Sequence, residues 1–272
     1  MEPQIVINAA GPWIDIANQS MGYDTRLIGG TKGSHLILDH PQLRTAIGEN
    51  EFFFENKDGR IVLLFPLFDK VIVGTSDLPI DDPETARCTE KEVDYFLEMI
   101  DIVFPGISVD RSHIVYRFSG VRPLPASDAT TTGQISRDHS LRVLEPGQGL
   151  NFPIFNLIGG KWTSFRAFSE QATDKTLEYL HMSRKTSTRD LPIGGGRDYP
   201  NTESARQFWI DSISQETGCD PKQVNTLFRR YGTRAAEIAR GISIRNDSPL
   251  TSLPEYSQEE IKLIVREEKV VH

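Results

Sequence analysis

Cysteine is scarce in this sequence, with only Cys88 and Cys219 among 272 residues. The two lie far apart, and neither belongs to a Cys-x-x-Cys pair. The six histidines also lack metal-site spacing such as His-x-x-x-His. A disulfide framework needs several cysteines, and a zinc site needs closely spaced ligands. We therefore expect unpaired thiols in a reducing compartment, and we predict no metal site.

Long apolar runs and an excess of positive charge are absent too. No stretch reaches the roughly 18 apolar residues of a membrane span, and the N-terminus has no basic-then-apolar secretory pattern. The net charge of −8 argues against a nucleic-acid partner. The apolar fraction of 38% and the charged fraction of 25% are typical of a globular chain. At about 150 residues per domain, this length predicts one or two domains.

Hydrophobic patterning predicts a sheet followed by helices. Short strands between residues 27 and 74, with tight turns at Asp58-Gly59 and Phe68-Asp69, predict an antiparallel meander. The clearest helix is expected over 89–104, where Thr89 and Glu92 form a capping box. Further strands are expected at 113–119, 141–144 and 155–158, and further helices at 164–180, 202–217, 221–231, 233–242 and 257–268.

A strand, two glycines and a helix follow one another at Phe155–Arg166. The apolar run Phe155–Ile158 leads into Gly159-Gly160-Lys161, and Thr163 and Ser164 then open the helical pattern. Glycine removes the Cβ that would block a close approach, and the first helical turn offers unpaired N–H groups. This pattern favours contact with a phosphate or a ring, although a plain strand-to-helix loop has the same appearance.

Three more motifs precede this one. They are Asn8-Ala9-Ala10-Gly11-Pro12-Trp13, Lys32-Gly33-Ser34-His35 and Ser119-Gly120-Val121-Arg122-Pro123-Leu124. In this order the motifs resemble those of the flavin-dependent glycerol-3-phosphate dehydrogenases, over about residues 6–180. That family begins with a βαβ unit carrying Gly-x-Gly-x-x-Gly, which is missing from these 272 residues. The resemblance implies a fragment without the N-terminal dinucleotide-binding unit and without the end of the C-terminal helical domain.

The resemblance also implies a fold and a domain arrangement. We expect an α+β chain in which residues 30–149 form a largely antiparallel substrate-binding sheet with helices. Residues 1–29 and 150–180 are expected to be the remnant of an α/β flavin-binding domain. Residues 191–272 are expected to be a partial C-terminal helical domain.

Four residues are implied to act on the substrate. The resemblance places Arg122 at the substrate phosphate, where a planar guanidinium suits the ligand; an arginine paired with a surface carboxylate is the alternative. It places Arg137 near the mouth of the substrate site, and a solvated loop arginine is the alternative. His35 is implied as the proton acceptor for the substrate hydroxyl, and a histidine bonded to backbone at a strand start is the alternative. Lys161 is implied near the flavin ring, where a cation stabilises developing negative charge. Asp77, in Gly74-Thr75-Ser76-Asp77, is expected to be a turn residue.

FAD is the implied cofactor. The resemblance assigns Gly11, Gly33, Ser34, Gly159, Gly160, Lys161 and Thr163 to its binding. Because the dinucleotide motif is missing, we expect the fragment not to retain FAD and to be inactive alone.

The implied reaction is the oxidation of sn-glycerol 3-phosphate to dihydroxyacetone phosphate, with electrons passing through FAD to a quinone. The alternatives are an amine or amino-acid oxidase, a glycerophosphate oxidase that uses O₂, and a non-catalytic phosphometabolite-binding or assembly module. We expect a cytoplasmic protein, with peripheral contact to the inner face of the membrane as a further expectation.

Overall fold

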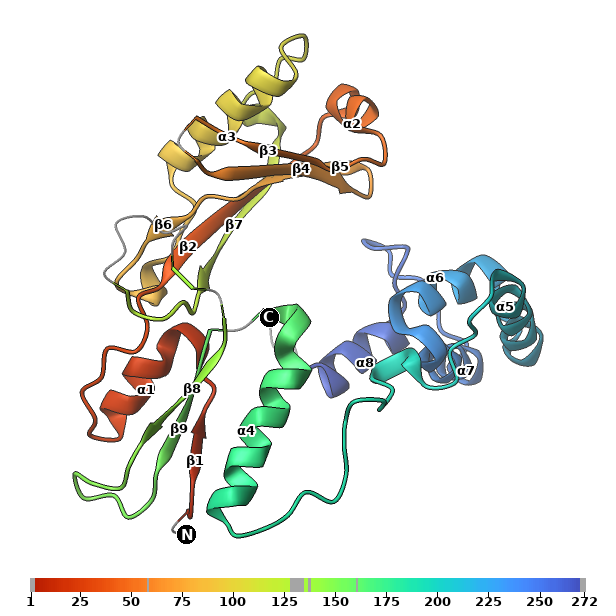
Figure 1. Cartoon of the computed structure of the whole chain (residues 1–272). Helices are drawn as coiled ribbons and strands as arrows, with labels where there is room; N and C mark the ends of the chain where they lie inside the picture. The colour runs from red at the N-terminus through yellow and green to blue at the C-terminus, as the bar shows by residue number, and fades with distance from the viewer. Residues whose placement is uncertain (1–2, 58, 128–134, 137, 160, 270–272) are drawn as a thin grey trace. The chain divides into compact units, whose positions relative to one another are not determined.

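Two sheets and two groups of helices build the chain, which a computed structural model describes over residues 3–57, 59–127, 135–136, 138–159 and 161–269. The chain divides into two units, residues 1–185 and 186–272 (Figure 1). Both sheets lie in the first unit, and the second unit contains helices α5 to α8.

The large sheet of the first unit is antiparallel, as the strand pattern predicts. Its order is β3-β4-β5-β2-β6, and β7 also pairs with β2. The strands are β2 (Thr31–Leu38), β3 (Phe52–Glu55), β4 (Ile61–Leu67), β5 (Lys70–Gly74), β6 (Leu78–Pro79) and β7 (Ile114–Arg122). Along one side of β2, β5 ends opposite His35 and β6 begins opposite Lys32. The short segment 75–77 therefore crosses the gap between β5 and β6 beside the middle of β2.

One face of this sheet is covered by α3 (Glu90–Val103), as Figure 1 shows. The predicted capping box is confirmed, since Thr89 Oγ1 accepts a hydrogen bond from the Glu92 N–H and the Glu92 carboxylate accepts one from the Thr89 N–H. Val93, Phe96 and Ile100 project from α3 into a core formed with β2, β4 and β5. Burial of these apolar side chains holds the helix on the sheet.

A short helix that the sequence reading missed, α2 (Pro41–Ile47), follows β2. His40 caps it, because the His40 Nδ1 atom accepts a hydrogen bond from the Leu43 N–H. Pro41 occupies the first turn, where the missing N–H costs nothing. Leu43 and Ile47 are buried in the core of the large sheet.

The small sheet of the first unit contains β1 (Val6–Asn8), β9 (Ile154–Ile158) and β8 (Ser140–Leu144), in that order. β1 and β9 are parallel, whereas β8 and β9 are antiparallel. Helix α1 (Ile14–Ser20) follows β1, and α4 (Phe165–Tyr179) follows β9. The expected boundary at residue 149 therefore separates two paired strands. The β8–β9 hydrogen bonds place β8 in the small sheet, not in the large one.

The second unit is helical, as predicted. Its helices are α5 (Glu203–Thr217), α6 (Pro221–Tyr231), α7 (Ala235–Arg245) and α8 (Gln258–Glu267). Side chains from all four helices form its core, among them Ile213, Leu227, Ile238 and Leu263.

Candidate functional site

The face of the large sheet opposite α3 carries the first group of candidate residues. Side chains alternate along β2, so Thr31, Gly33 and His35 share this face, whereas Lys32 and Ser34 point towards α3. In β7, Arg122 pairs with Thr31 and Phe118 pairs with His35, which places both on the same face. Two candidates from distant motifs, His35 and Arg122, are thus brought to one surface.

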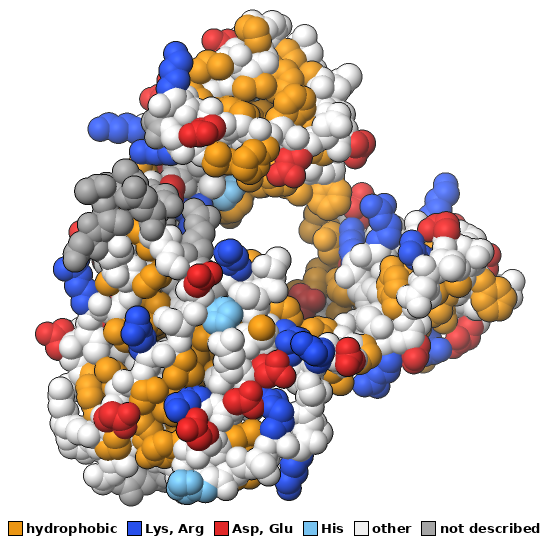
Figure 2. All heavy atoms as spheres, viewed as in Figure 1, with side chains coloured by type: hydrophobic (Ala, Val, Ile, Leu, Met, Phe, Trp, Pro, Cys, Tyr) orange, Lys and Arg blue, Asp and Glu red, His pale blue; other side chains and the backbone are white. Residues whose placement is uncertain are grey.

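This surface is rich in exposed apolar side chains. Phe53, Tyr116 and Phe118 are 67%, 61% and 37% exposed, whereas Leu36 and Leu38, on the α3 face of β2, are fully buried. Figure 2 shows hydrophobic side chains gathered over the part of the first unit that carries the large sheet. The candidate polar groups therefore lie beside an apolar surface.

Arg122 is held by a turn of three residues. Its Nη2 donates to Thr75 Oγ1 and its Nη1 donates to Asp77 Oδ1, each over 3.0 Å. Both nitrogens also lie 3.4 Å from the Ser76 carbonyl oxygen. The Arg122 side chain is 25% exposed and that of Asp77 is 15% exposed. The carboxylate pairing left open for Arg122 is therefore present, and Asp77 acts as more than a turn residue.

Two glycines make room for the candidate side chains. A Cβ on Gly33 would lie 2.5 Å from Arg122 Nη2 and from Thr75 Oγ1. A Cβ on Gly74 would lie 2.2 Å from the His35 ring. Gly33, expected at the cofactor, is needed here for the close passage of the Arg122 guanidinium over the strand.

His35 is kept in its neutral form. Burial, and then the nearby positive charge of Arg122, lower the pKa of His35 below its ordinary value. Its ring stacks on Phe118, with centroids 4.9 Å apart and planes 9° from parallel. The His35 Nδ1 atom is buried and, among the residues described, has no hydrogen-bond partner. A neutral imidazole can accept a proton, and the backbone-bonded alternative for the Nδ1 atom is not observed.

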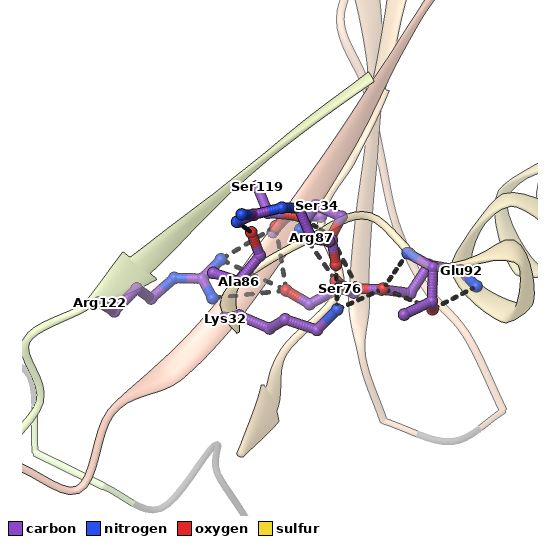
Figure 3. A network of polar contacts seen from close by, with 10 residues as sticks. Lys32, Ser34, Ser76, Ala86, Arg87, Glu92, Ser119 and Arg122 are labelled. Carbon is purple, nitrogen blue, oxygen red and sulfur yellow. Dashed lines mark hydrogen bonds and ion pairs between the residues drawn. The ribbon is translucent and has the colours of Figure 1, made fainter. Parts of the chain in front are cut away.

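A buried polar network lies on the α3 side of the same strand. Glu92 Oε1 accepts hydrogen bonds from the hydroxyls of Ser34 and Ser76, over 2.7 and 2.6 Å. Glu92 Oε2 lies 2.6 Å from Lys32 Nζ, and Lys32 also donates to the Arg87 carbonyl. Figure 3 shows Ser76 between Arg122 on one side and Glu92 on the other. Despite burial, these donors lower the pKa of Glu92 to about 2.

The Ser34 side chain lies on the α3 side of β2, and its role at the cofactor stays a prediction. The residue is fully buried, and its hydroxyl also lies 2.6 Å from the Ser119 hydroxyl. Because β2 side chains alternate, an even-numbered residue points to α3 when His35 points to the open face. The Ser34 side chain therefore supports the Glu92 network.

The second group of candidates lies at the small sheet. Gly11 and Gly159 follow the carboxyl ends of the parallel strands β1 and β9, with φ values of +60° and +73°. A Cβ on Gly159 would lie 2.7 Å from the Asp138 carbonyl oxygen, so this turn requires glycine. Lys161 and Thr163 are exposed at the start of the helical segment that continues as α4. Ligands of α/β sheets bind at such strand ends, and these residues fit an edge of that kind.

Arg137 and Gly160, the remaining candidates, lie outside the described residues. The roles of Gly11, Gly159, Lys161 and Thr163 at a cofactor stay predictions, as does that of Arg137 at the substrate. Among the residues the structure describes, no cluster of His, Cys, Asp or Glu could hold a metal ion. No described helix is long and apolar enough to cross a membrane.

The sequence reading missed the roles of Thr75, Ser76, Glu92 and Lys32. Glu92 was identified only as part of a capping box, which is a local signal. The Gly74-Thr75-Ser76-Asp77 motif was visible, but its contact with Arg122 depends on the pairing of β2 with β7. The available signal was the hydroxyl residues of two short motifs, Ser34 in Lys32–His35 and both Thr75 and Ser76 in Gly74–Asp77.

Comparison with known proteins gives two family matches. Residues 2–149 match the model described as "FAD dependent oxidoreductase". Residues 186–272 match the "C-terminal domain of alpha-glycerophosphate oxidase". The second match begins at Thr186, the first residue of the second structural unit.

The curated relatives are dehydrogenases of polyol phosphates. A Synechocystis "Glycerol-3-phosphate dehydrogenase" is 31% identical over 86% of this chain and 42% of its own length. One from Pseudomonas tolaasii is 32% identical over 89% of this chain and 46% of its own. A Brucella abortus "D-erythritol 1-phosphate dehydrogenase" is 30% identical over 87% of this chain and 46% of its own length. The chain spans less than half the length of these relatives.

A solved structure has the same fold. The glycerol-3-phosphate dehydrogenase of Bacillus halodurans, complexed with FAD, superposes with a TM-score of 0.69 at 22% identity. The match covers 96% of this chain and 52% of that one.

Proposed function

The chain belongs to the FAD-dependent oxidoreductase family, and from this premise we propose that it forms the substrate-reading part of a glycerol-3-phosphate dehydrogenase. The observation that carries the proposal is the shared face of β2 and β7. There His35, with its lowered pKa, lies near Arg122, whose guanidinium is oriented by Thr75 and Asp77. Glycerol 3-phosphate offers an anion for Arg122 and a secondary alcohol for His35. The names of the curated relatives support this substrate class.

Arg122 binds the phosphate in this proposal. Its guanidinium is already oriented by Thr75 and Asp77, so little side-chain entropy is lost on binding. A planar fork can give two parallel hydrogen bonds to a phosphate, which the point charge of a lysine cannot. The Arg122 side chain is 25% exposed, so a phosphate can reach the guanidinium from solvent.

His35 takes the hydroxyl proton at Nε2, because its Nδ1 atom is buried. Its lowered pKa keeps the ring unprotonated and ready to accept a proton at neutral pH. The apolar surface around Phe118 would shield the reacting carbon from water once substrate and flavin cover it. Bound FAD would supply the hydride acceptor at its flavin ring.

We assign the flavin edge to Gly11, Gly159, Lys161 and Thr163. Two glycines with left-handed φ allow backbone to approach a ring, and Lys161 adds positive charge beside it.

In this proposal the product is dihydroxyacetone phosphate and a quinone is the electron acceptor. The enzyme is cytoplasmic with peripheral membrane contact. We also propose that these 272 residues alone neither retain FAD nor turn over substrate, because they contain no Gly-x-Gly-x-x-Gly.

A dye-linked oxidation assay tests the proposal. The FAD-bound enzyme that contains this chain should oxidise glycerol 3-phosphate with a far higher kcat/KM than glycerol. Erythritol 1-phosphate is the necessary comparison, because one relative carries that name. A preference for erythritol 1-phosphate would move the assignment to a longer polyol phosphate, and equal rates on glycerol would overturn it.

A further inference from the structure

The segment Thr75–Asp77 holds Arg122 with each of its residues. Thr75 offers its hydroxyl, Ser76 its carbonyl and Asp77 its carboxylate to the guanidinium. The direction of the guanidinium therefore depends on the position of this segment.

Ser76 is also anchored from the opposite side of the sheet. Its hydroxyl donates to Glu92 Oε1 over 2.6 Å and accepts from the Ser34 N–H over 2.9 Å. Ser76 is fully buried and Glu92 is 3% exposed, so water does not compete for these bonds. A carboxylate on α3 thus reaches the segment that orients Arg122.

Glu92 is itself tightly fixed. Besides Ser76 and Ser34, its carboxylate accepts hydrogen bonds from the Thr89 N–H and hydroxyl, over 2.8 and 2.7 Å. Lys32, which is 8% exposed, lies 2.6 Å from it and balances its charge. The side chain therefore provides a rigid point of attachment.

We propose that Glu92 is a positioning residue for phosphate recognition: through Ser76 it fixes the Thr75–Asp77 segment and so directs the Arg122 guanidinium to the substrate. This inference rests on the proposed function, in which Arg122 binds the phosphate. Glu92 touches no substrate, because it lies on the other face of the sheet.

The first test uses NMR titration of His35 in the 272-residue chain without cofactor. Burial and then Arg122 lower the pKa of His35, so in variants that leave His35 equally buried this pKa reports where the guanidinium lies. In Ser76→Ala and Glu92→Gln the released guanidinium moves away, and the His35 pKa should rise. In Glu92→Gln the loss of the negative charge would by itself lower the His35 pKa. A rise in this variant can therefore be distinguished from the direct effect of the lost charge. An unchanged or lower His35 pKa in folded Ser76→Ala overturns the proposal.

Glu98→Gln is the matched control, because Glu98 is exposed on the same helix. It should leave the His35 pKa unchanged. Ser76→Ala removes one hydroxyl and leaves the Lys32–Glu92 pair in place, so it keeps the test decisive if Glu92→Gln does not fold.

The second test uses the FAD-bound enzyme. Glu92→Gln and Ser76→Ala should raise the KM for glycerol 3-phosphate about 10-fold with little change in kcat, while the KM for glycerol stays constant. An equal loss on both substrates would show a structural role and overturn the proposal. If the unaltered enzyme does not prefer the phosphorylated substrate, the proposed function fails, and a raised His35 pKa in Ser76→Ala would still support the positioning of Arg122.

Discussion

Replacing Arg122 with alanine should remove the phosphate preference of the enzyme. The guanidinium makes two hydrogen bonds of 3.0 Å inside the protein, which orient it before a ligand arrives. A charge-assisted bond contributes about 1.5–3 kcal/mol, and a two-pronged contact at a site 25% exposed to water should contribute about 2–4 kcal/mol. Since each 1.4 kcal/mol is about tenfold, kcat/KM for glycerol 3-phosphate should fall roughly 30- to 1000-fold.

The measurement compares glycerol 3-phosphate with glycerol in a dye-linked assay of the FAD-bound enzyme. Arg122→Lys should recover only part of the loss, because an ammonium group cannot reproduce the planar fork. Arg117→Ala is the control, since Arg117 lies on the same strand but pairs with Glu90 at the surface. If Arg122→Ala lowers activity on both substrates by one factor, the residue shapes the fold or the flavin site and the phosphate assignment is wrong.

Three further predictions concern the same face and its support. Gly33→Ala should displace the Arg122 guanidinium and raise the KM for glycerol 3-phosphate in steady-state kinetics. Gly120→Ala is the control and should leave this KM unchanged, because no atom lies within 4 Å of its new Cβ. The pKa of Glu92 is lowered from 4.5 to about 2, so the ionised carboxylate stabilises the folded protein fully above pH 4.5, and this contribution is lost as the pH falls from 4.5 to 2. The free energy of unfolding in urea should therefore depend less on pH across this window in Glu92→Gln. Because folding lowers the pKa of His35 from 6.5, the imidazole takes up a proton more readily in the unfolded chain, and the stability of the protein should fall as the pH drops below 6.5. Thermal melts of His35→Gln should lose this part of the pH dependence, and a pH dependence identical to that of the unaltered protein would contradict the burial argument.

Local patterns predicted most of the secondary structure. Thr89 and Glu92 set the start of α3, and apolar spacing set its buried face. The resemblance to flavin-dependent glycerol-3-phosphate dehydrogenases is confirmed by the family matches and by the curated relatives. Helix α2 was missed because Pro41 follows a strand closely and its cap is a histidine, which is an uncommon capping residue.

The site was only partly readable, because its contacts join residues distant in sequence. Arg122 meets Thr75 across 47 positions, and Lys32 meets Glu92 across 60. No local spacing encodes such contacts, which follow from strand order and register. The contact of Ser34 with Glu92 was not predicted for the same reason, since adjacent residues in a motif point to opposite faces once the motif lies in a strand.

Strand β2 separates two kinds of evolutionary change. Its open-face residues Thr31, Gly33 and His35 lie on the face of Arg122, so changes there would alter the proposed site, whereas Lys32, Ser34, Leu36 and Leu38 are tied to α3. Insertion or deletion of a single residue would exchange the two sets, turning Ser34 outward and burying His35. Point substitutions in β2 should therefore affect either the site or the core, while a change in the length of the strand should affect both.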